Sequence, residues 1–301
     1  MSNINTLPAA PPLDEDDLAP QQERLADAWW SLRHNATSMV GLVLLSVIVL
    51  AALLAPLLAP YDPYALDIAR ANLPPSGSHP FGTDQFGHDI FSRVLYGARL
   101  DLLIAVASVA ASATIGSVLG GISGYVGRYV DEALMRVMDM LQAFPRFIFA
   151  MGIAFALGPG LTTVIVATAA LNIPGYARLM RNLILSLKQT QYALSAVAVG
   201  NSGPRVLFRH LFPNALAPIL VTSTLQSGWA ILEAAGLSFI GLGVAVPTAE
   251  WGVMIAMGLQ EFLQGHWWVY TFPGLAIGVT VLAFNLIGDG LQDILDPRRR
   301  S

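Results

Sequence analysis

The sequence contains no cysteine and a single lysine among its 301 residues. The missing thiols exclude disulfide scaffolds, thiolate metal sites, iron–sulfur clusters and cysteine nucleophiles. Charge is scarce too, because only 12% of the residues are charged, against about 25% in typical soluble domains. The formal net charge is −4, so the chain lacks the basic character that indicates nucleic-acid binding.

Apolar sequence is what the chain has in abundance, with 54% hydrophobic residues and a mean hydropathy of +0.58. A helix needs about 20 mostly apolar residues to cross the roughly 30 Å hydrocarbon core of a bilayer. Uncharged runs of that length predict an all-α integral membrane protein with six transmembrane helices. We expect the spans near residues 39–60, 100–124, 133–157, 161–179, 212–235 and 268–288.

The third and fourth spans divide one uncharged run, residues 147–177, at Gly158-Pro159-Gly160. This triplet is typical of a turn rather than of a helix interior. Since only eleven residues of the run precede the triplet, the third helix is expected to begin near Ala133. It then includes Arg136 and Asp139, which are spaced for an ion pair on one helix face.

Lys and Arg indicate the orientation of the chain, because cytoplasmic loops retain positive charge. With both termini in the cytoplasm, twelve of the sixteen basic residues lie on the inner side and three lie outside. The remaining one, Arg146, falls within the third span. The chain then divides into a cytoplasmic tail (1–36), the first span with a periplasmic loop (37–99), a five-helix core (100–292) and a cytoplasmic tail (293–301). The acidic N-terminal tail has no basic segment before an apolar stretch, so we expect no cleavable signal peptide.

The outer loop combines turn-forming glycines with His79, Asp84, His88 and Asp89. Asp89 is well placed to cap a helix that begins at Ile90. The two histidines and two aspartates raise the alternative of a metal site. Their spacing matches no metal-binding signature, so we expect a capped loop and no metal.

The inner segment 178–212 carries five basic residues around the small-residue stretch Ser195-Ala196-Val197-Ala198-Val199. Gly200 follows this stretch and supplies the left-handed turn that ends a helix. Pro204 suits the first position of the next helix. The pattern predicts two short helices joined by a tight bend, and composition alone allows a simple interfacial helix equally well.

At these residues the chain resembles the permease subunits of bacterial ATP-binding-cassette (ABC) importers, in particular the second permease of dipeptide, oligopeptide and nickel uptake systems. The cytoplasmic loop of that family reads Glu-Ala-Ala, three residues, Gly, nine residues, then a hydrophobic residue, any residue, Leu and Pro. Here Leu194-Ser195-Ala196 stands at the start, Gly200 at the glycine and Pro213 at the proline. Leu194 replaces the glutamate.

Further segments carry the same resemblance, which covers roughly residues 39–300. They are the outer-loop stretch 81–99, Glu233-Ala234-Ala235 with 237–243, the stretch 247–252 and the stretch 271–298. The resemblance implies a type I ABC importer permease fold with a cytoplasmic coupling helix, in the bacterial inner membrane.

The chain lacks a nucleotide site of its own, because Lys188 lies between Leu187 and Gln189 and not in a phosphate-binding loop. ATP and magnesium are therefore expected on separate subunits, and this chain is expected to be non-catalytic and to bind no cofactor. The resemblance implies a second permease, two ABC ATPases and a periplasmic binding protein as partners. It leaves dipeptides, oligopeptides, glutathione, metal chelates and nickel open as substrates.

The resemblance also assigns ATPase coupling to the inner segment, with a short helix near residues 191–199 in a groove of the ATPase. The basic residues of this segment are explained equally well by the positive-inside rule. The candidate coupling residues are Leu194, Ser195, Ala196, Gly200, Arg205, Arg209 and Pro213.

Polar residues inside spans are candidates for the translocation path, because they are costly in lipid and usually face protein or water. Hydrogen bonds between packed helices explain them equally well. The candidates are Gln142, Asn172, Gln226, Glu233 and Asn285. Gly116, Gly120 and Gly124 instead predict a face for close helix packing.

Two other classes of protein compete with an importer permease. An ion-gradient-driven secondary transporter predicts inverted repeats and broken helices with charge at mid-membrane, and the two halves show no clear repeat. A membrane-embedded enzyme predicts a catalytic constellation at one depth, which the sequence does not display. Stable capture of an ATPase favours the importer, whereas uptake driven by protons or sodium favours the carrier.

Overall fold

The computed structural model describes residues 35–295, in which every regular element is a helix apart from one antiparallel bridge between Thr83 and Asp89. The elements are α2 (Ala36–Leu53), α3 (Ala55–Leu58), η2 (Ile68–Arg70), α4 (Ile90–Val126), α5 (Arg128–Ala143), α6 (Arg146–Leu157), α7 (Leu161–Leu187), α8 (Gln191–Ala198), α9 (Gly203–Arg205), η3 (Val206–Leu211), α10 (Phe212–Phe239), α11 (Trp251–Leu259), η4 (Phe262–Gln264) and α12 (Trp268–Leu295). Most of the predicted tails, 1–36 and 293–301, lies outside the described residues.

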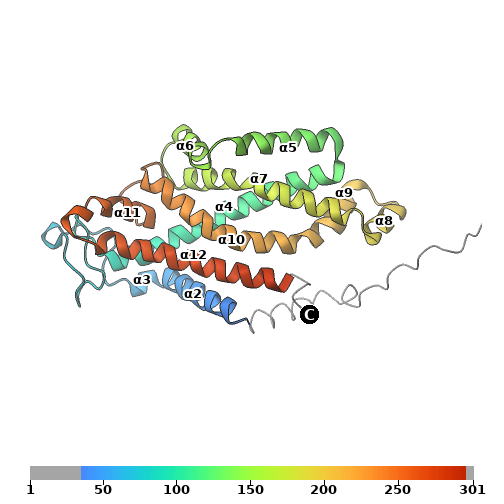
Figure 1. Ribbon diagram of the computed structural model, residues 1–301. Coiled ribbons are helices and arrows are strands. Elements are labelled where there is room, and N and C mark those ends of the chain that lie inside the picture. Colours follow the sequence, from blue (N-terminus) through green and yellow to red (C-terminus); the bar gives the residue numbers. More distant parts are fainter. Residues whose placement is uncertain (1–34, 296–301) are drawn as a thin grey trace, which may run out of the picture.

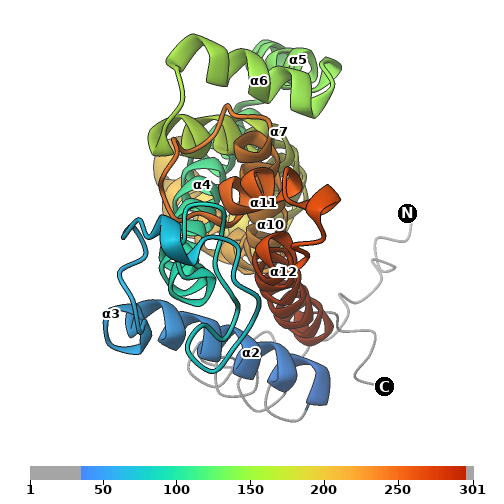
Figure 2. The same cartoon turned by 90° about the vertical axis from the view of Figure 1, so that its left-hand side faces the viewer.

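The long helices α4, α7, α10 and α12 form the body of the molecule, with α2 and α3 on one flank and α5 and α6 on the other (Figures 1 and 2). The loop before α4 and helix α11 lie at one end, and α8 lies at the opposite end (Figure 1). The two ends correspond to the predicted outer and inner sides of the chain.

Four helical stretches are long and apolar enough to cross a membrane, namely α2, α4, the stretch Gly203–Phe239 and α12, and the bent pair of α5 and α6 gives a fifth. Helix α7 has 27 residues, but Asn172 and Arg178 within it lower its hydropathy. The all-helical membrane prediction is confirmed, while the count of six spans is not confirmed by length and composition.

The prediction of one continuous third helix over 133–157 is wrong. Helix α5 ends at Ala143, α6 begins at Arg146, and the two helices are bent by 93°. Pro145 explains the break, because proline lacks an amide hydrogen and forces the preceding residue out of the helical region. Phe144 is accordingly extended, with φ −84° and ψ 141°.

The predicted ion pair between Arg136 and Asp139 is also wrong. Asp139 instead accepts from Arg178 of α7 at 2.6 Å, and Arg136 lies 4.0 Å from Glu132. The reason is a tertiary contact, because α7 packs beside α5 and places Arg178 next to Asp139. Arg181 of α7 likewise binds both carboxylate oxygens of Asp131, so ionic contacts fasten α5 to α7.

The predicted glycine face of α4 is confirmed, and it packs against α7. A Cβ at Gly116, Gly120 or Gly124 would lie 2.6, 2.0 or 2.7 Å from a backbone oxygen of α7. The three oxygens belong to Ile173, Ala177 and Arg181, which advance by four residues as the glycines do. The two helices therefore run parallel with their backbones in contact, and the chain returns between them through α5 and α6.

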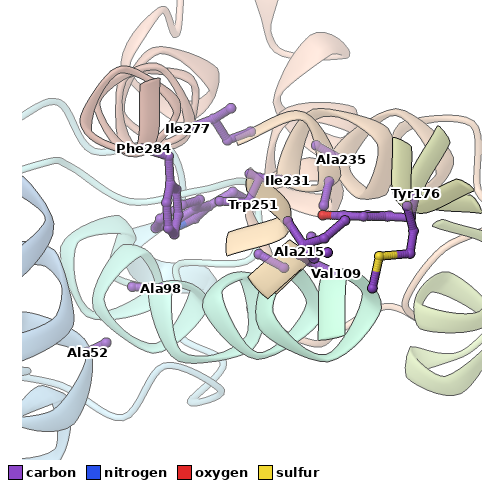
Figure 3. Packing of buried hydrophobic residues seen from close by; sticks show 14 of the residues in the cluster. Ala52, Ala98, Val109, Tyr176, Ala215, Ile231, Ala235, Trp251, Ile277 and Phe284 are labelled. Carbon is purple, nitrogen blue, oxygen red and sulfur yellow. The ribbon is translucent and has the colours of Figure 1, made fainter. Parts of the chain in front are cut away.

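One hydrophobic cluster ties the body together, with members from α2, α4, α7, α10, α11 and α12 (Figure 3). Trp251 at the start of α11 is one of its two tryptophans and is 1% exposed. The indole nitrogen of Trp251 donates to the carbonyl of Val94 at 3.0 Å. A Cβ at Gly97 would lie 2.8 Å from the same ring, so glycine makes room for the tryptophan in α4.

We predict that Gly120→Ala lowers the thermal stability and yield of the purified protein, because its Cβ meets the backbone of Ala177. Gly121→Ala is the matched control in the same turn, since its Cβ meets only side-chain atoms, the nearest 3.5 Å away. In the control, alanine gains helix propensity of up to about 1 kcal/mol. Equal melting temperatures for the two variants, measured in one detergent, would contradict the backbone contact.

Candidate functional site

The inner segment forms one short helix, α8, followed by the predicted bend. The second predicted short helix is not separate, because α9 and η3 run without a break into α10 as the stretch Gly203–Phe239. Helix α8 begins at Gln191 and ends at Ala198, one residue before the expected end. The side-chain amide of Asn201 donates to the carbonyl of Ala196 at 2.9 Å, and Gly200 has φ +90°. Pro204 is the second residue of α9, one position later in the helix than predicted.

Helix α8 presents an apolar outer surface at the inner end of the molecule. Leu194, Val197 and Val199 are 58%, 54% and 83% exposed. On the other side of the helix, Ala193 is buried and Ala196 packs against the main hydrophobic cluster. Exposed apolar residues outside the predicted membrane region form a surface suited to a protein partner.

Of the candidate coupling residues, all but Ala196 are exposed in this part of the structure. The exposed ones are Leu194, Ser195, Gly200, Arg205, Arg209 and Pro213. The segment itself is anchored, because Val206, Leu207 and Leu211 of η3 are at most 3% exposed.

The inner end of α4 also contacts the inner segment. The ammonium group of Lys188 donates to the carbonyl of Tyr125 at 2.8 Å. Gly203 lies so close to the Tyr125 ring that an added Cβ would be 3.1 Å from it. Residues on both sides of α8 therefore contact the last turn of α4.

A second group of functional candidates meets where α6, α7 and α10 come together. Asn172 of α7 is 2% exposed, and its side-chain oxygen accepts from Arg146 at 3.1 Å and from Gln226 at 2.9 Å. Its amide donates to Glu233 at 3.1 Å. Arg146 also forms an ion pair with Glu233. We call Arg146, Asn172, Gln226 and Glu233 the polar cluster.

Three members of the polar cluster, Arg146, Gln226 and Glu233, line a pocket of about 450 Å³ whose other walls are apolar. Phe147 and Ala150 of α6, Leu171 of α7, and Trp229, Leu232 and Leu237 of α10 complete the lining. Asn172 lies eleven residues after the start of α7, which places the cluster about 16 Å along that helix. The cluster is therefore well removed from both ends of the bundle.

The structure thus brings together three of the five predicted path residues. Gln142 lies apart, bonded to Arg178, and it lines a smaller neighbouring pocket that shares Arg146. Asn285 is half-buried on α12 and is not part of the cluster. Sequence reasoning missed Arg146, although a lone basic residue inside an apolar stretch is the signal that could have found it.

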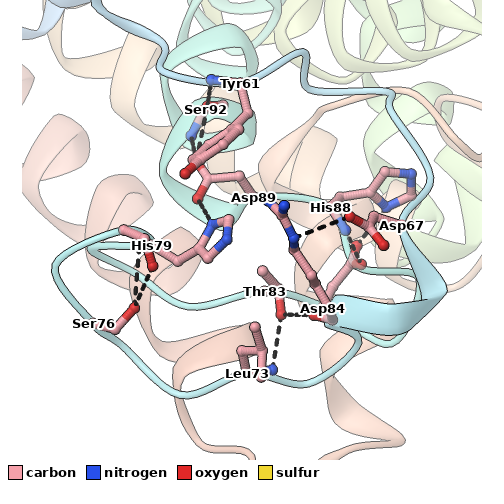
Figure 4. A network of polar contacts seen from close by, with 12 residues as sticks. Tyr61, Asp67, Leu73, Ser76, His79, Thr83, Asp84, His88, Asp89 and Ser92 are labelled. Carbon is pink, nitrogen blue, oxygen red and sulfur yellow. Dashed lines mark hydrogen bonds and ion pairs between the residues drawn. The ribbon is translucent and has the colours of Figure 1, made fainter.

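The histidines of the outer loop are each paired with a carboxylate (Figure 4). His79 lies 2.9 Å from Asp89, and His88 lies 2.8 Å from Asp84. The other oxygen of Asp89 accepts from the backbone and hydroxyl of Ser92, both at 2.8 Å. Asp89 therefore caps α4 as predicted, and each histidine binds one of the two aspartates.

Comparison with protein families places these features in a known context. Residues 116–301 match the family described as binding-protein-dependent transport system inner membrane component. Residues 24–75 match the N-terminal transmembrane domain of oligopeptide transport permease C. The two matches together contain α2, the glycine face of α4, the polar cluster and α8.

Several curated relatives are similar over nearly the whole chain. The dipeptide transport system permease protein DppC of Alkalihalophilus pseudofirmus is 41% identical over 98% of this chain and 96% of its own length. The di/tripeptide transport system permease protein DppC of Pseudomonas aeruginosa is 39% identical over 99% of each. The oligopeptide transport system permease protein OppC of Bacillus subtilis is 40% identical over 91% and 90%.

We predict that Asn172→Leu destabilises the protein, because it leaves Arg146, Gln226 and Glu233 without their shared partner. The expected cost is about 1–3 kcal/mol for buried polar groups that lose a hydrogen bond. Asn182→Leu is the matched control, since Asn182 is exposed on the same helix. Thermal unfolding in detergent measures both, and a loss no larger than that of the control would show that the cluster adds no stability.

Proposed function

This chain belongs to the family of binding-protein-dependent transport system inner membrane components, and we propose that it is the permease subunit of an ATP-driven importer of di- and oligopeptides. The observation that carries the proposal is full-length similarity to permeases whose names specify dipeptide, di/tripeptide and oligopeptide transport. A chain of several apolar helices with a pocket among polar side chains suits the movement of a small polar solute through a membrane.

In this proposal, the energy for transport comes from ATP hydrolysis by separate subunits. Two ABC ATPases hold the ATP and magnesium, and α8 docks on one of them by its exposed face of Leu194, Val197 and Val199. Leu194 stands where the family resemblance expects glutamate. The contact between α8 and the ATPase therefore relies on apolar packing rather than on a charged side chain at this position. The anchoring of the segment to Tyr125 supports the transmission of ATPase movement into α4.

A homologous second permease and a periplasmic binding protein complete the proposed complex in the bacterial inner membrane. Both termini of this chain lie in the cytoplasm, on the side where α8 meets the ATPases. Rigid groups of helices then tilt between inward-open and outward-open arrangements as the ATPases close. Nickel, metal chelates and glutathione are the alternative cargoes within the same family.

We predict that proteoliposomes with the complete complex accumulate a radiolabelled dipeptide only when ATP and the binding protein are supplied. Ion gradients alone should drive no uptake, because the energy enters through the ATPases. Purification by a tag on this chain should retain the ATPases. Accumulation driven by a proton or sodium gradient without ATPases would contradict an ABC importer and favour a secondary transporter.

We also predict that Gly200→Glu uncouples ATP hydrolysis from uptake while the protein still folds. Gly200 is exposed, and a Cβ there would have no atom within 4 Å, so the new side chain projects toward the docked ATPase. We expect the peptide transported per ATP to fall by roughly tenfold, equivalent to about 1.4 kcal/mol.

Gly200→Ala is the control for this variant, because both substitutions suffer the same strain at φ +90°. The alanine variant should keep most of its coupling, since it adds only a methyl group. Equal peptide-to-ATP ratios in the glutamate variant and the wild type would overturn the role of this turn.

A further inference from the structure

The pocket beside the polar cluster is lined by a charged pair whose two members are unequally exposed. Glu233 is 9% exposed and well enclosed, whereas the side chain of Arg146 is 57% exposed. Burying a charged group in apolar surroundings is costly unless it is paired. Glu233 is thus enclosed, whereas more than half of the Arg146 side chain is exposed.

Arg146 has hydrogen-bond donors to spare. A guanidinium carries five N–H donors in a planar fork, and the contacts to Asn172 and Glu233 both use Nη2. Among residues 35–295, neither Nε nor Nη1 of Arg146 donates a hydrogen bond to a protein group. A planar fork with free donors binds a carboxylate by two parallel hydrogen bonds.

The carboxylate of Glu233 is not equally available. One of its oxygens accepts from Arg146 and the other from the amide of Asn172, and Asn172 is itself held by Gln226. Among the residues that line the pocket, the free charged group is therefore a donor, and the other polar side chain is the neutral amide of Gln226. The pocket selects an anionic group over a cationic one.

The charges of the cluster also limit how tightly an anion is held. Arg146 and Glu233 cancel one another, so the site is formally neutral before an anion arrives. A transport path needs binding that is favourable enough for entry and weak enough for release. The pocket also reaches Phe147, in the first turn of α6, and the start of a helix favours negative charge.

We infer that the Arg146 guanidinium binds the C-terminal carboxylate of a peptide as it passes through the pocket. The inference rests on the proposed function and names the part of the cargo that this chain recognises. The terminal carboxylate is common to all peptides whatever their sequence. The surrounding apolar walls of Phe147, Trp229 and Leu232 accommodate side chains of different size without specific polar contacts.

The test measures weak binding directly, by saturation-transfer NMR on the complete complex in nanodiscs without the binding protein. The probes are one dipeptide with a free C-terminus and the same dipeptide with a C-terminal amide. The wild-type complex should give a signal for the acid that is about tenfold stronger than for the amide, as the loss of charge-assisted hydrogen bonds requires. Arg146→Met should remove this preference.

Two further variants make the result specific. Arg146→Lys keeps the charge and loses the fork, so its preference for the acid should be intermediate. Arg136→Met is the matched control, because Arg136 is exposed on α5 and lies outside the pocket lining. It should behave as the wild type.

Two outcomes overturn the inference: no signal for the acid with the wild-type complex, or the same acid-to-amide ratio after Arg146→Met as before. ATP-driven uptake of the acid by the wild-type complex is measured in parallel. If uptake succeeds while the ratio is unchanged, the proposed function stands and this site is wrong. If no uptake occurs in the wild type, the proposed function itself fails.

Discussion

Backbone contact between α4 and α7 is the constraint on which the rest of this structure depends. Three glycines one turn apart let the two helices approach until their main chains touch, and no residue with a Cβ fits at Gly120 without displacement. In a bilayer, close packing of this kind replaces the hydrophobic drive that holds soluble helices together. The parallel pair is consequently a stiff unit that runs from the inner end of the chain toward the outer one.

Both functional regions are attached to that unit. The inner segment contacts α4 through Lys188 and Gly203 at Tyr125, and the polar cluster is centred on Asn172 of α7. In the proposed function, this arrangement is the route by which movement of α8 would reach the pocket. Helices α5 and α6 differ, because ionic contacts hold α5 to α7 and the chain is broken at Pro145 between them.

The sequence was sufficient for features that depend on local chemistry. The glycine spacing of α4, the Asp89 cap and the turn at Gly200 each follow from what one residue type does to a backbone, and the structure confirms all three. Helix α8 was predicted to within one residue for the same reason. The extent of apolar runs likewise indicated membrane helices, although it does not establish their number.

Features that depend on contacts between helices could not be predicted from the sequence. Arg136 and Asp139 satisfy a helical spacing rule, yet Arg178 from another helix takes the aspartate. The sequence contains Pro145, but the apolar run that follows it favours one continuous helix rather than a bend. Arg146 meets Glu233, which is 87 residues away in sequence, and no local pattern links the two. The polar residues of the cluster were recognised singly, whereas their grouping appears only when α6, α7 and α10 are packed.

Contact between α8 and an ATPase is the central claim of this account, and site-specific cross-linking tests it most directly. The chain has no cysteine, so a single cysteine in place of Val199 gives this subunit one labelling site. A photoactivatable label there should cross-link to an ATPase subunit in membranes, and the same label in place of Leu263, 91% exposed at the other end of the molecule, should not. Absence of an ATPase adduct from position 199, or equal adducts from both positions, would contradict the account.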